Sequence, residues 1–172
     1  GSLQELVVDF KAVIFTKFKA KKMSNETMIG LIGAGRWGPN VIGAVNRING
    51  AKLVKVADPN QEALANLKLK FPAVKATQSS CEIFEDQKID AVAICTPVET
   101  HTNLVRSALD QGKHVFIEKP FGHDFQECLS LCRLAEEKGL SIVVGHVFLF
   151  NASILTLKEI LKRGEIGEVL HI

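Results

Sequence analysis

The feature that most constrains the fold is a glycine-rich loop that directly follows an apolar strand. Residues 29–38 read Ile-Gly-Leu-Ile-Gly-Ala-Gly-Arg-Trp-Gly, which places Gly33, Gly35 and Gly38 at G-x-G-x-x-G spacing. In such a loop the first glycine permits a tight turn, the second lets the backbone approach a pyrophosphate, and the third lets the next helix pack against the strand. The phosphates then lie on free N–H groups at the positive end of that helix. The spacing predicts a dinucleotide site, although an ordinary glycine-rich turn can share it.

An acidic residue closes the β-α-β unit that this loop opens. Residues 51–58 form a second apolar strand, and Asp58 at its end lies 25 positions after Gly33. This offset is near the ~20 residues at which a carboxylate accepts hydrogen bonds from the adenosine ribose hydroxyls. We therefore predict that Asp58 binds the ribose of the dinucleotide.

Two points about this acid stay open. Its charge would repel a 2′-phosphate, which favours NAD over NADP, whereas Arg36 in the glycine loop leaves NADP open. The sequence Asp58-Pro59-Asn60 also fits a simple helix cap, with Pro59 at the first helical position. Both roles can hold together.

Length and composition describe an ordinary domain with a sizeable core. The chain has 172 residues, of which 47% are hydrophobic and 23% charged, so one α/β domain fits and two full domains do not. The net charge of +2 gives no case for nucleic acid or a membrane surface as a partner. No apolar stretch reaches the ~18 residues of a transmembrane helix. The five histidines form no close pair, so no metal site is expected.

The cysteines and the first residues bear on location. The four cysteines lack C-x-x-C spacing, which predicts packing thiols in a reducing compartment and hence a cytoplasmic protein; they are Cys81, Cys95, Cys128 and Cys132. Residues 1–26 form an N-terminal extension or tag-derived tail that begins with a cloning remnant, Gly1-Ser2. Its apolar residues at helical spacing and its lysines could suit targeting or a membrane surface. The acids Glu5 and Asp9, which interrupt this pattern, and the lack of arginine favour a tail that packs locally.

The rest of the chain alternates between helix and strand. After Asp58 the pattern predicts helices at 61–70, 79–86, 99–111 and 124–138, and strands at 72–76, 89–95, 113–117 and 140–144. Asp124 is predicted to cap the last of these helices, with Gly112 and Gly139 as stops after the third and fourth. Such alternation indicates an α/β fold with a doubly wound parallel sheet of the Rossmann type.

Three strand ends carry unusual residues. Thr96-Pro97 follows one strand and leads to His101, Glu118-Lys119-Pro120 follows the next, and Gly145-His146 follows the last. Because ligands bind at the carboxyl ends of the strands in such a sheet, these residues should face one crevice. The alternative for Glu118 and Lys119 is a solvated turn closed by proline.

Taken together, these residues resemble the glucose-fructose oxidoreductase, inositol dehydrogenase and MocA-like family of NAD(P)-dependent dehydrogenases. The resemblance runs from about residue 27 to the end and rests on the glycine loop, Asp58, Thr96-Pro97 with His101, and above all Glu118-Lys119-Pro120. Residues 145–151 and 162–168 are most similar to bacterial sugar and nucleotide-sugar dehydrogenases of this family.

The resemblance implies a role for each of these residues. Gly33, Gly35, Arg36, Trp37 and Gly38 would form the pyrophosphate loop, and Asp58 would hold the ribose. Thr96, Pro97 and His101 would line the cofactor channel, with His101 alternatively packing under the loop at the start of a helix. Glu118 and Lys119 would flank the nicotinamide. Lys119 would be the catalytic residue, because its positive charge favours the alkoxide that develops as hydride leaves the carbon.

The resemblance also implies a second α/β domain, which carries most substrate contacts. Residues 27–150 would be the NAD(P)-binding domain, and residues 151–172 the start of a missing or truncated second domain. In that part, 153–163 would form the linking helix and 167–172 a first sheet strand, through which copies could associate.

Two classes of function follow. The chain is either the nucleotide-binding domain of an oxidoreductase that transfers a hydride between a sugar or nucleotide-sugar hydroxyl carbon and NAD(P), or a non-catalytic dinucleotide-binding or assembly module. As the former, the fragment alone is expected to be inactive.

Overall fold

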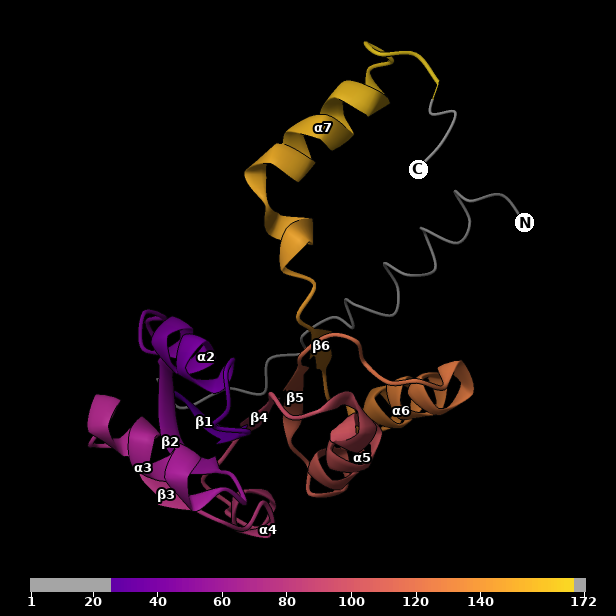
Figure 1. Cartoon of the computed structure of the whole chain (residues 1–172). Helices are drawn as coiled ribbons and strands as arrows, with labels where there is room; N and C mark the ends of the chain where they lie inside the picture. Colours follow the sequence, from indigo (N-terminus) through magenta and orange to yellow (C-terminus); the bar gives the residue numbers. More distant parts are fainter. Residues whose placement is uncertain (1–25, 169–172) are drawn as a thin grey trace.

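The computed structural model describes residues 26–168, and its central feature is an open sheet of six strands (Figure 1). The strands are β1 (Thr27–Ile32), β2 (Ala51–Ala57), β3 (Lys75–Thr77), β4 (Ala91–Ile94), β5 (His114–Ile117) and β6 (Ile142–Val144). They lie in the order β3-β2-β1-β4-β5-β6, and all neighbouring pairs are parallel. This is the order of a doubly wound Rossmann sheet, so the predicted fold class is confirmed.

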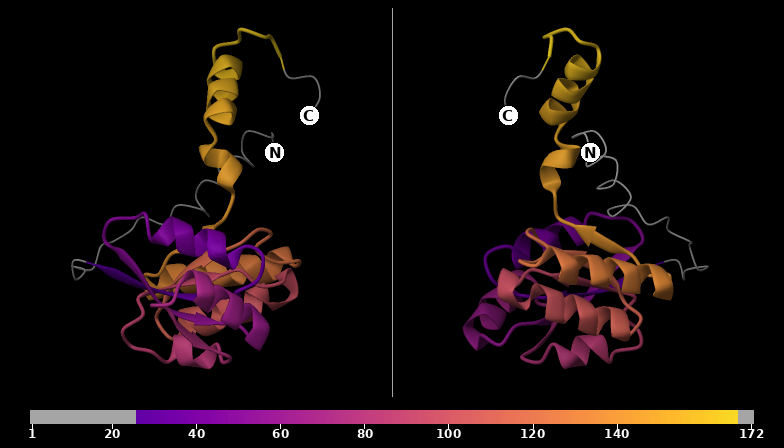
Figure 2. Two further views of the ribbon diagram at one scale, coloured as in Figure 1. Left: turned by 60° about the vertical axis from the view of Figure 1, so that its left-hand side comes forward. Right: turned by 90° about the vertical axis from the view of Figure 1, so that its right-hand side faces the viewer.

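Helices cover both faces of the sheet (Figures 1 and 2). On one face lie α2 (Gly38–Val45) and α3 (Gln61–Lys70); on the other lie α4 (Cys81–Phe84), α5 (His101–Asp110) and α6 (Phe125–Lys138). Each face has its own buried apolar cluster, one centred on Leu31, Ile42, Val56 and Leu67, the other on Ile83, Ile94, Leu109 and Leu131. Central strands that are buried on both faces need continuous apolar runs, as in the Ala-Val-Ala-Ile sequence of β4.

Side-chain caps mark where α3 and α6 begin. Asn60 caps α3, because its side chain accepts hydrogen bonds from the N–H groups of Glu62 and Ala63. The expectation that Pro59 occupies the first helical position is therefore wrong, since Pro59 precedes the cap. Asp124 caps α6 as predicted, and Gly139 ends it at φ 65°.

Some predicted elements differ in extent. The third strand was expected at 72–76 but runs from Lys75 to Thr77, because Pro72 lies in a turn and has no N–H to donate to a strand ladder. The helix expected at 79–86 is a single turn, α4. A 3₁₀ turn, η1 (Val98–Thr100), precedes α5, and Gly112 follows this helix at φ 70°.

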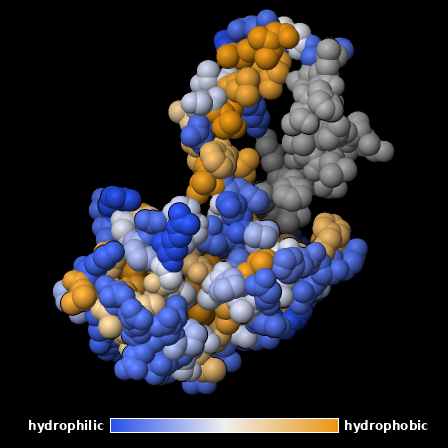
Figure 3. Space-filling view, viewed as in Figure 1, coloured by the Kyte–Doolittle hydropathy of each residue, from blue (hydrophilic) through white to orange (hydrophobic). Residues whose placement is uncertain are grey.

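The last described helix projects away from the sheet (Figures 1 and 2). A 3₁₀ turn, η2 (Val147–Phe150), leads to α7 (Ala152–Lys162), which Asn151 caps. Apolar side chains on both segments are exposed, as Figure 3 shows; they include Phe148, Phe150, Ile154, Leu155 and Leu157. A helix is thus present where 153–163 was predicted to be helical, and its linking role stays a prediction. The strand expected at 167–172 lies mostly outside the described residues, as does the N-terminal extension.

No helix in residues 26–168 is long and apolar enough to cross a membrane. Within the same range, no group of three or more histidine, cysteine, aspartate or glutamate side chains could hold a metal ion.

Polar side chains tie the strands together at the amino-terminal edge of the sheet. The buried Lys113 donates to the carbonyls of Asp86 and Ile89 at 2.8 and 2.7 Å, and burial lowers the pKa of this lysine against the opposing effect of Asp86 and Asp90. At the start of β5, His114 Nδ1 accepts a hydrogen bond from Ser141 N–H at 3.1 Å. Burial lowers the pKa of His114, which the Asp90 carboxylate partly offsets.

This arrangement predicts a pH dependence of stability. Because the folded state holds His114 with a pKa below its unfolded value of about 6.5, its contribution is fully present above pH 6.5. It is lost as the pH falls from there toward the folded pKa, at no more than about 1.4 kcal/mol per pH unit. Denaturant unfolding between pH 5 and 8 should show a shallower dependence in His114→Asn. The exposed His123 gives a control, since His123→Asn should keep the wild-type profile; equal profiles for all three proteins would refute the assignment.

Candidate dinucleotide-binding site

The glycine loop lies where the winding direction of the sheet changes. From β1 the chain proceeds to β2 and β3 on one side, and then crosses to β4 on the other side of β1. β1 and β4 end together, since Ile32 pairs with Ile94. A crevice at the carboxyl ends of such a strand pair is the usual ligand position in a doubly wound sheet.

Two of the three glycines are required by close packing. Gly33 has φ 102°, and a Cβ atom there would lie 2.5 Å from the carbonyl oxygen of Cys95, the residue directly after β4. A Cβ at Gly38 would lie 2.5 Å from the carbonyl oxygen of Gly33, so this glycine lets α2 start directly against the turn. Gly35 differs, because no atom lies within 4 Å of its Cβ position. Packing explains Gly33 and Gly38, while the space beside Gly35 is open.

The N–H groups of the loop divide into two sets. Gly33 N–H donates to the Ala57 carbonyl at 2.8 Å, and Ala34 N–H donates to Asp58 Oδ2 at 2.7 Å. The next four N–H groups have no hydrogen-bond partner within the described part of the chain; they belong to Gly35, Arg36, Trp37 and Gly38. These donors lie at the start of α2, where the helix dipole is positive. Such a row of free N–H groups fits the pyrophosphate of a dinucleotide.

Asp58 joins the loop to the end of β2. Besides the bond to Ala34, its Oδ1 accepts from Asn60 N–H at 2.8 Å. The carboxylate therefore orders the turn before α3 without capping that helix, and each of its oxygens can still accept from a ligand. Arg36 and Trp37 are exposed on the loop.

The end of β4 is ordered by its own side chains. Thr96 Oγ1 and Thr100 Oγ1 lie 2.7 Å apart, and Thr100 Oγ1 donates to the Pro97 carbonyl at 2.7 Å. Thr96 is half-buried and Pro97 exposed. The sequence interpretation omitted Thr100, although a threonine shortly after Thr-Pro is a common source of such local bonds.

His101 packs under the loop at the start of a helix, as in the alternative given for it from the sequence. The side chain is 1% exposed, at the first residue of α5. Its Nδ1 lies 2.7 Å from the Pro120 carbonyl oxygen and its Nε2 lies 2.8 Å from the Thr96 carbonyl oxygen. Both ring nitrogens face carbonyl oxygens of the protein, so the ring packs under the loops, while its predicted place along the cofactor channel stays a prediction.

The end of β5 brings two predicted residues together. Glu118 is 9% exposed, and its N–H donates to the Ile94 carbonyl at 3.0 Å. Lys119 is exposed and is joined to Pro120 by a cis peptide bond. Gly145 at the end of β6 lies against this turn, because a Cβ there would be 3.2 Å from Glu118 Oε1. Sequence alone gave no reason for that glycine, since the contact joins two different strands.

The thiol nearest to the loop is chemically inert. Burial, with a smaller effect of the Glu118 carboxylate, raises the pKa of Cys95 to about 12. The thiol stays protonated at neutral pH and is a poor nucleophile. All four cysteines are free.

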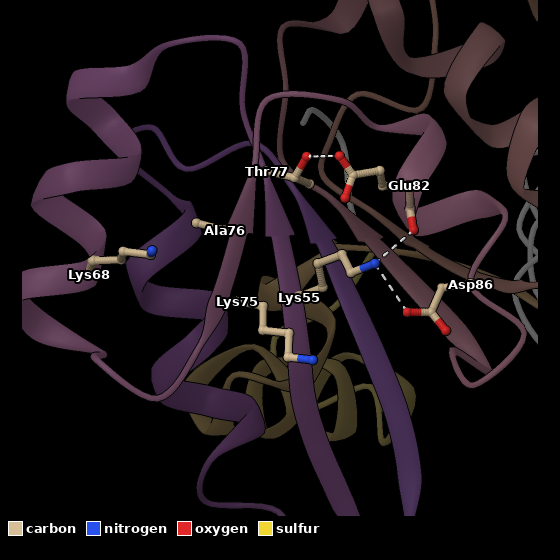
Figure 4. A pocket seen from close by; sticks show the side chains of 7 residues that line it. All are labelled: Lys55, Lys68, Lys75, Ala76, Thr77, Glu82 and Asp86. Carbon is tan, nitrogen blue, oxygen red and sulfur yellow. Dashed lines mark hydrogen bonds and ion pairs between the residues drawn. The ribbon is translucent and has the colours of Figure 1, made fainter.

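A cavity of about 380 Å³ is lined by residues of β2, β3, α3 and α4 and of the turn after α4 (Figure 4). Its lining residues are Lys55, Lys68, Lys75, Ala76, Thr77, Glu82 and Asp86. Lys55 is paired with Asp86 at 3.1 Å and donates to the Glu82 carbonyl at 3.0 Å. No predicted site residue lines this cavity, although the carbonyl of its lining residue Thr77 accepts a hydrogen bond from Asp58 N–H at 3.1 Å.

Several known proteins are similar to this chain in sequence or structure. The scyllo-inositol 2-dehydrogenase (NAD(+)) of Bacillus subtilis is 30% identical over 150 residues, covering 87% of this chain and 44% of that protein. The 2,7-anhydro-N-acetylneuraminate hydratase of Escherichia coli is 29% identical over 142 residues, covering 82% and 37% respectively. The scyllo-inositol dehydrogenase of Lactobacillus casei, solved with NAD(H) and scyllo-inositol, superposes with a TM-score of 0.75 at 28% identity, covering 83% and 43%. The chain spans less than half the length of these relatives.

A family model described as an oxidoreductase family with an NAD-binding Rossmann fold matches residues 27–146, which is more than half of the chain. This match includes the glycine loop and the ends of β2, β4 and β5. The resemblance drawn from the sequence is confirmed: the chain belongs to the glucose-fructose oxidoreductase, inositol dehydrogenase and MocA-like family and carries its NAD-binding domain.

Proposed function

We propose that this chain is the cofactor-binding part of a dehydrogenase that transfers a hydride between a hydroxyl-bearing carbon of a sugar or sugar alcohol and NAD. The observation that carries the proposal is the row of N–H groups from Gly35 to Gly38, which have no hydrogen-bond partner among residues 26–168, next to Ala34, whose N–H is bonded to the Asp58 carboxylate. The inositol dehydrogenases among the relatives support a polyhydroxylated substrate. Within this proposal, nucleotide sugars are a narrower class of substrate.

The loop and its acid would bind the adenosine half of the cofactor. The pyrophosphate would accept hydrogen bonds from the free N–H groups, with the side chains of Arg36 and Trp37 beside it. Asp58 would accept from the ribose hydroxyls with its remaining lone pairs. Its negative charge disfavours a 2′-phosphate, so we propose NAD as the preferred cofactor and NADP as the weaker one.

The ends of β4 and β5 would hold the nicotinamide half. Thr96 and Pro97 would line the channel, and Glu118 and Lys119 would flank the ring. Lys119 is exposed and so can reach a substrate, where its charge would stabilise the developing alkoxide and its amine could exchange a proton. His101 would only support these loops from beneath.

The full-length protein would bind its substrate with residues outside the cofactor domain. We propose that residues 27–150 form the cofactor domain and that α7 begins the connection to a substrate-binding part, because its exposed apolar side chains need a partner surface. Association between copies could also cover such a face. The four free thiols suit a cytoplasmic location.

The first test is calorimetric titration of the 172-residue chain with NADH and NADPH. We expect saturable NADH binding and a weaker NADPH response. Asp58→Asn removes the charge with little change in shape, and should weaken NADH binding by roughly tenfold or more, since hydrogen bonds to charged groups contribute about 1.5–3 kcal/mol. It should also narrow the difference between the two cofactors. No binding of either cofactor by the unmodified chain would refute the proposal and favour an assembly module.

The glycines give a matched pair of variants. Gly33→Ala should lower the unfolding free energy by about 1–3 kcal/mol or more, because of its positive φ and the Cys95 backbone contact. Gly35→Ala should leave the thermal midpoint unchanged or slightly raised, yet weaken NADH binding, because its methyl group would occupy the space proposed for the pyrophosphate. Unchanged NADH affinity in Gly35→Ala would place the pyrophosphate elsewhere.

Lys119 is tested by turnover. In the full-length protein, assayed for NADH formation with scyllo-inositol and other polyols, Lys119→Ala should reduce kcat by about 10²- to 10⁴-fold and change NADH affinity little. Lys138→Ala is the control, since that lysine pairs with Asp110 on the surface. If Lys119→Ala turns over like Lys138→Ala, the assigned role is wrong.

A further inference from the structure

The side chain of His101 joins two loops that contain proposed site residues. Its ring lies between the Thr96 carbonyl, 2.8 Å from Nε2, and the Pro120 carbonyl, 2.7 Å from Nδ1. Only 1% of the residue is exposed. One rigid ring therefore sets the separation between the loop after β4 and the loop after β5.

The chemistry of the two contacts makes the ring a donor. A carbonyl oxygen only accepts hydrogen bonds, so each contact requires an N–H on the ring. A neutral imidazole donates to one of the two oxygens, and an imidazolium donates to both. In each case the ring donates to a partly buried carbonyl contact, and removing the ring would take this donor away from the acceptor.

The backbone offers no substitute for this connection. Paired residues of β4 and β5 end at Ile94 and Ile117, and the next bond, from Glu118 N–H to the Ile94 carbonyl, is the last between these two segments. Beyond it, in residues 26–168, the polar contacts between the two loops are those of the buried His101 ring and an exposed pair, His123 Nε2 and Glu99 Oε1 at 4.0 Å. The second loop also packs closely on α5, because a Cβ at Gly122 would lie 2.8 Å from Thr102 Cγ2.

We infer that His101 is a positioning residue, which fixes Lys119 relative to the Thr96 loop by holding the Pro120 carbonyl. Lys119 is bonded directly to Pro120, so a shift of this carbonyl displaces the amine that is proposed to meet the substrate. The inference rests on the proposed function for the role of Lys119, whereas the bridge itself does not.

The two contacts of the His101 ring, with Pro120 and with Thr96, together form a bridge between the loops. Two substitutions test these contacts separately. In His101→Asn the amide nitrogen takes the place of Nδ1 and can still donate to Pro120, while in His101→Gln it takes the place of Nε2 and can still donate to Thr96. His101→Phe keeps the ring without either donor. These three substitutions at one position form a matched set.

The first measurement is amide hydrogen exchange of the chain without cofactor, followed by mass spectrometry. We expect residues 118–122 to exchange at least several-fold faster in His101→Gln and His101→Phe but at the wild-type rate in His101→Asn. Residues 96–100 should show the reverse preference between Asn and Gln. Equal exchange in all four proteins, or the same increase in all three variants, would overturn the bridge.

The second measurement tests positioning through kcat and KM in the full-length protein. His101→Gln should lower kcat by about tenfold and leave the KM for NAD nearly unchanged, and His101→Asn should restore kcat. In a Lys119→Ala background, His101→Gln should cause no further loss, because the two residues then act as one unit. Additive losses would overturn the positioning role. No turnover by the unmodified enzyme would refute the proposed function instead, and the exchange result would still decide the bridge.

Discussion

The turn at Gly33 is the contact on which the candidate site depends. Its backbone passes so close to the Cys95 carbonyl that no side chain fits, and this proximity brings the end of β1 against the end of β4. α2 can then start at once, with Gly38 packed on the same turn. The N–H groups from Gly35 to Gly38 consequently lie where β1 and β4 end, and within residues 26–168 they have no hydrogen-bond partner.

The polar groups around this turn show how the fold prepares a site before any ligand binds. Asp58 restrains the loop through Ala34 N–H, and His101 restrains the loops that follow β4 and β5. Both side chains have their bonds within the protein, so the geometry does not depend on a bound cofactor. A preorganised site of this kind loses less conformational entropy when it binds.

Local signals in the sequence were reliable where short-range chemistry decides the structure. The glycine spacing, the capping residue Asp124 and the stop at Gly139 each act within a few residues, and each was placed correctly. The third strand and the cap of α3 were misplaced by a few residues, because Pro72 and Pro59 each fit more than one local arrangement. The roles assigned to Glu118 and Lys119 rest on family resemblance and stay predictions.

The sequence by itself determined the fold class, the position of the glycine loop and the family, because periodicity and glycine spacing are properties of consecutive residues. Only the tertiary structure decided what His101, Asp58 and Gly145 contact. The contacts of His101 with Thr96 and Pro120, of Asp58 with Ala34, and of Gly145 with Glu118 join residues that lie 5 to 27 positions apart in the chain. Sheet order brings such residues together, and a pattern of neighbouring residues contains no information on which carbonyl a buried ring will meet.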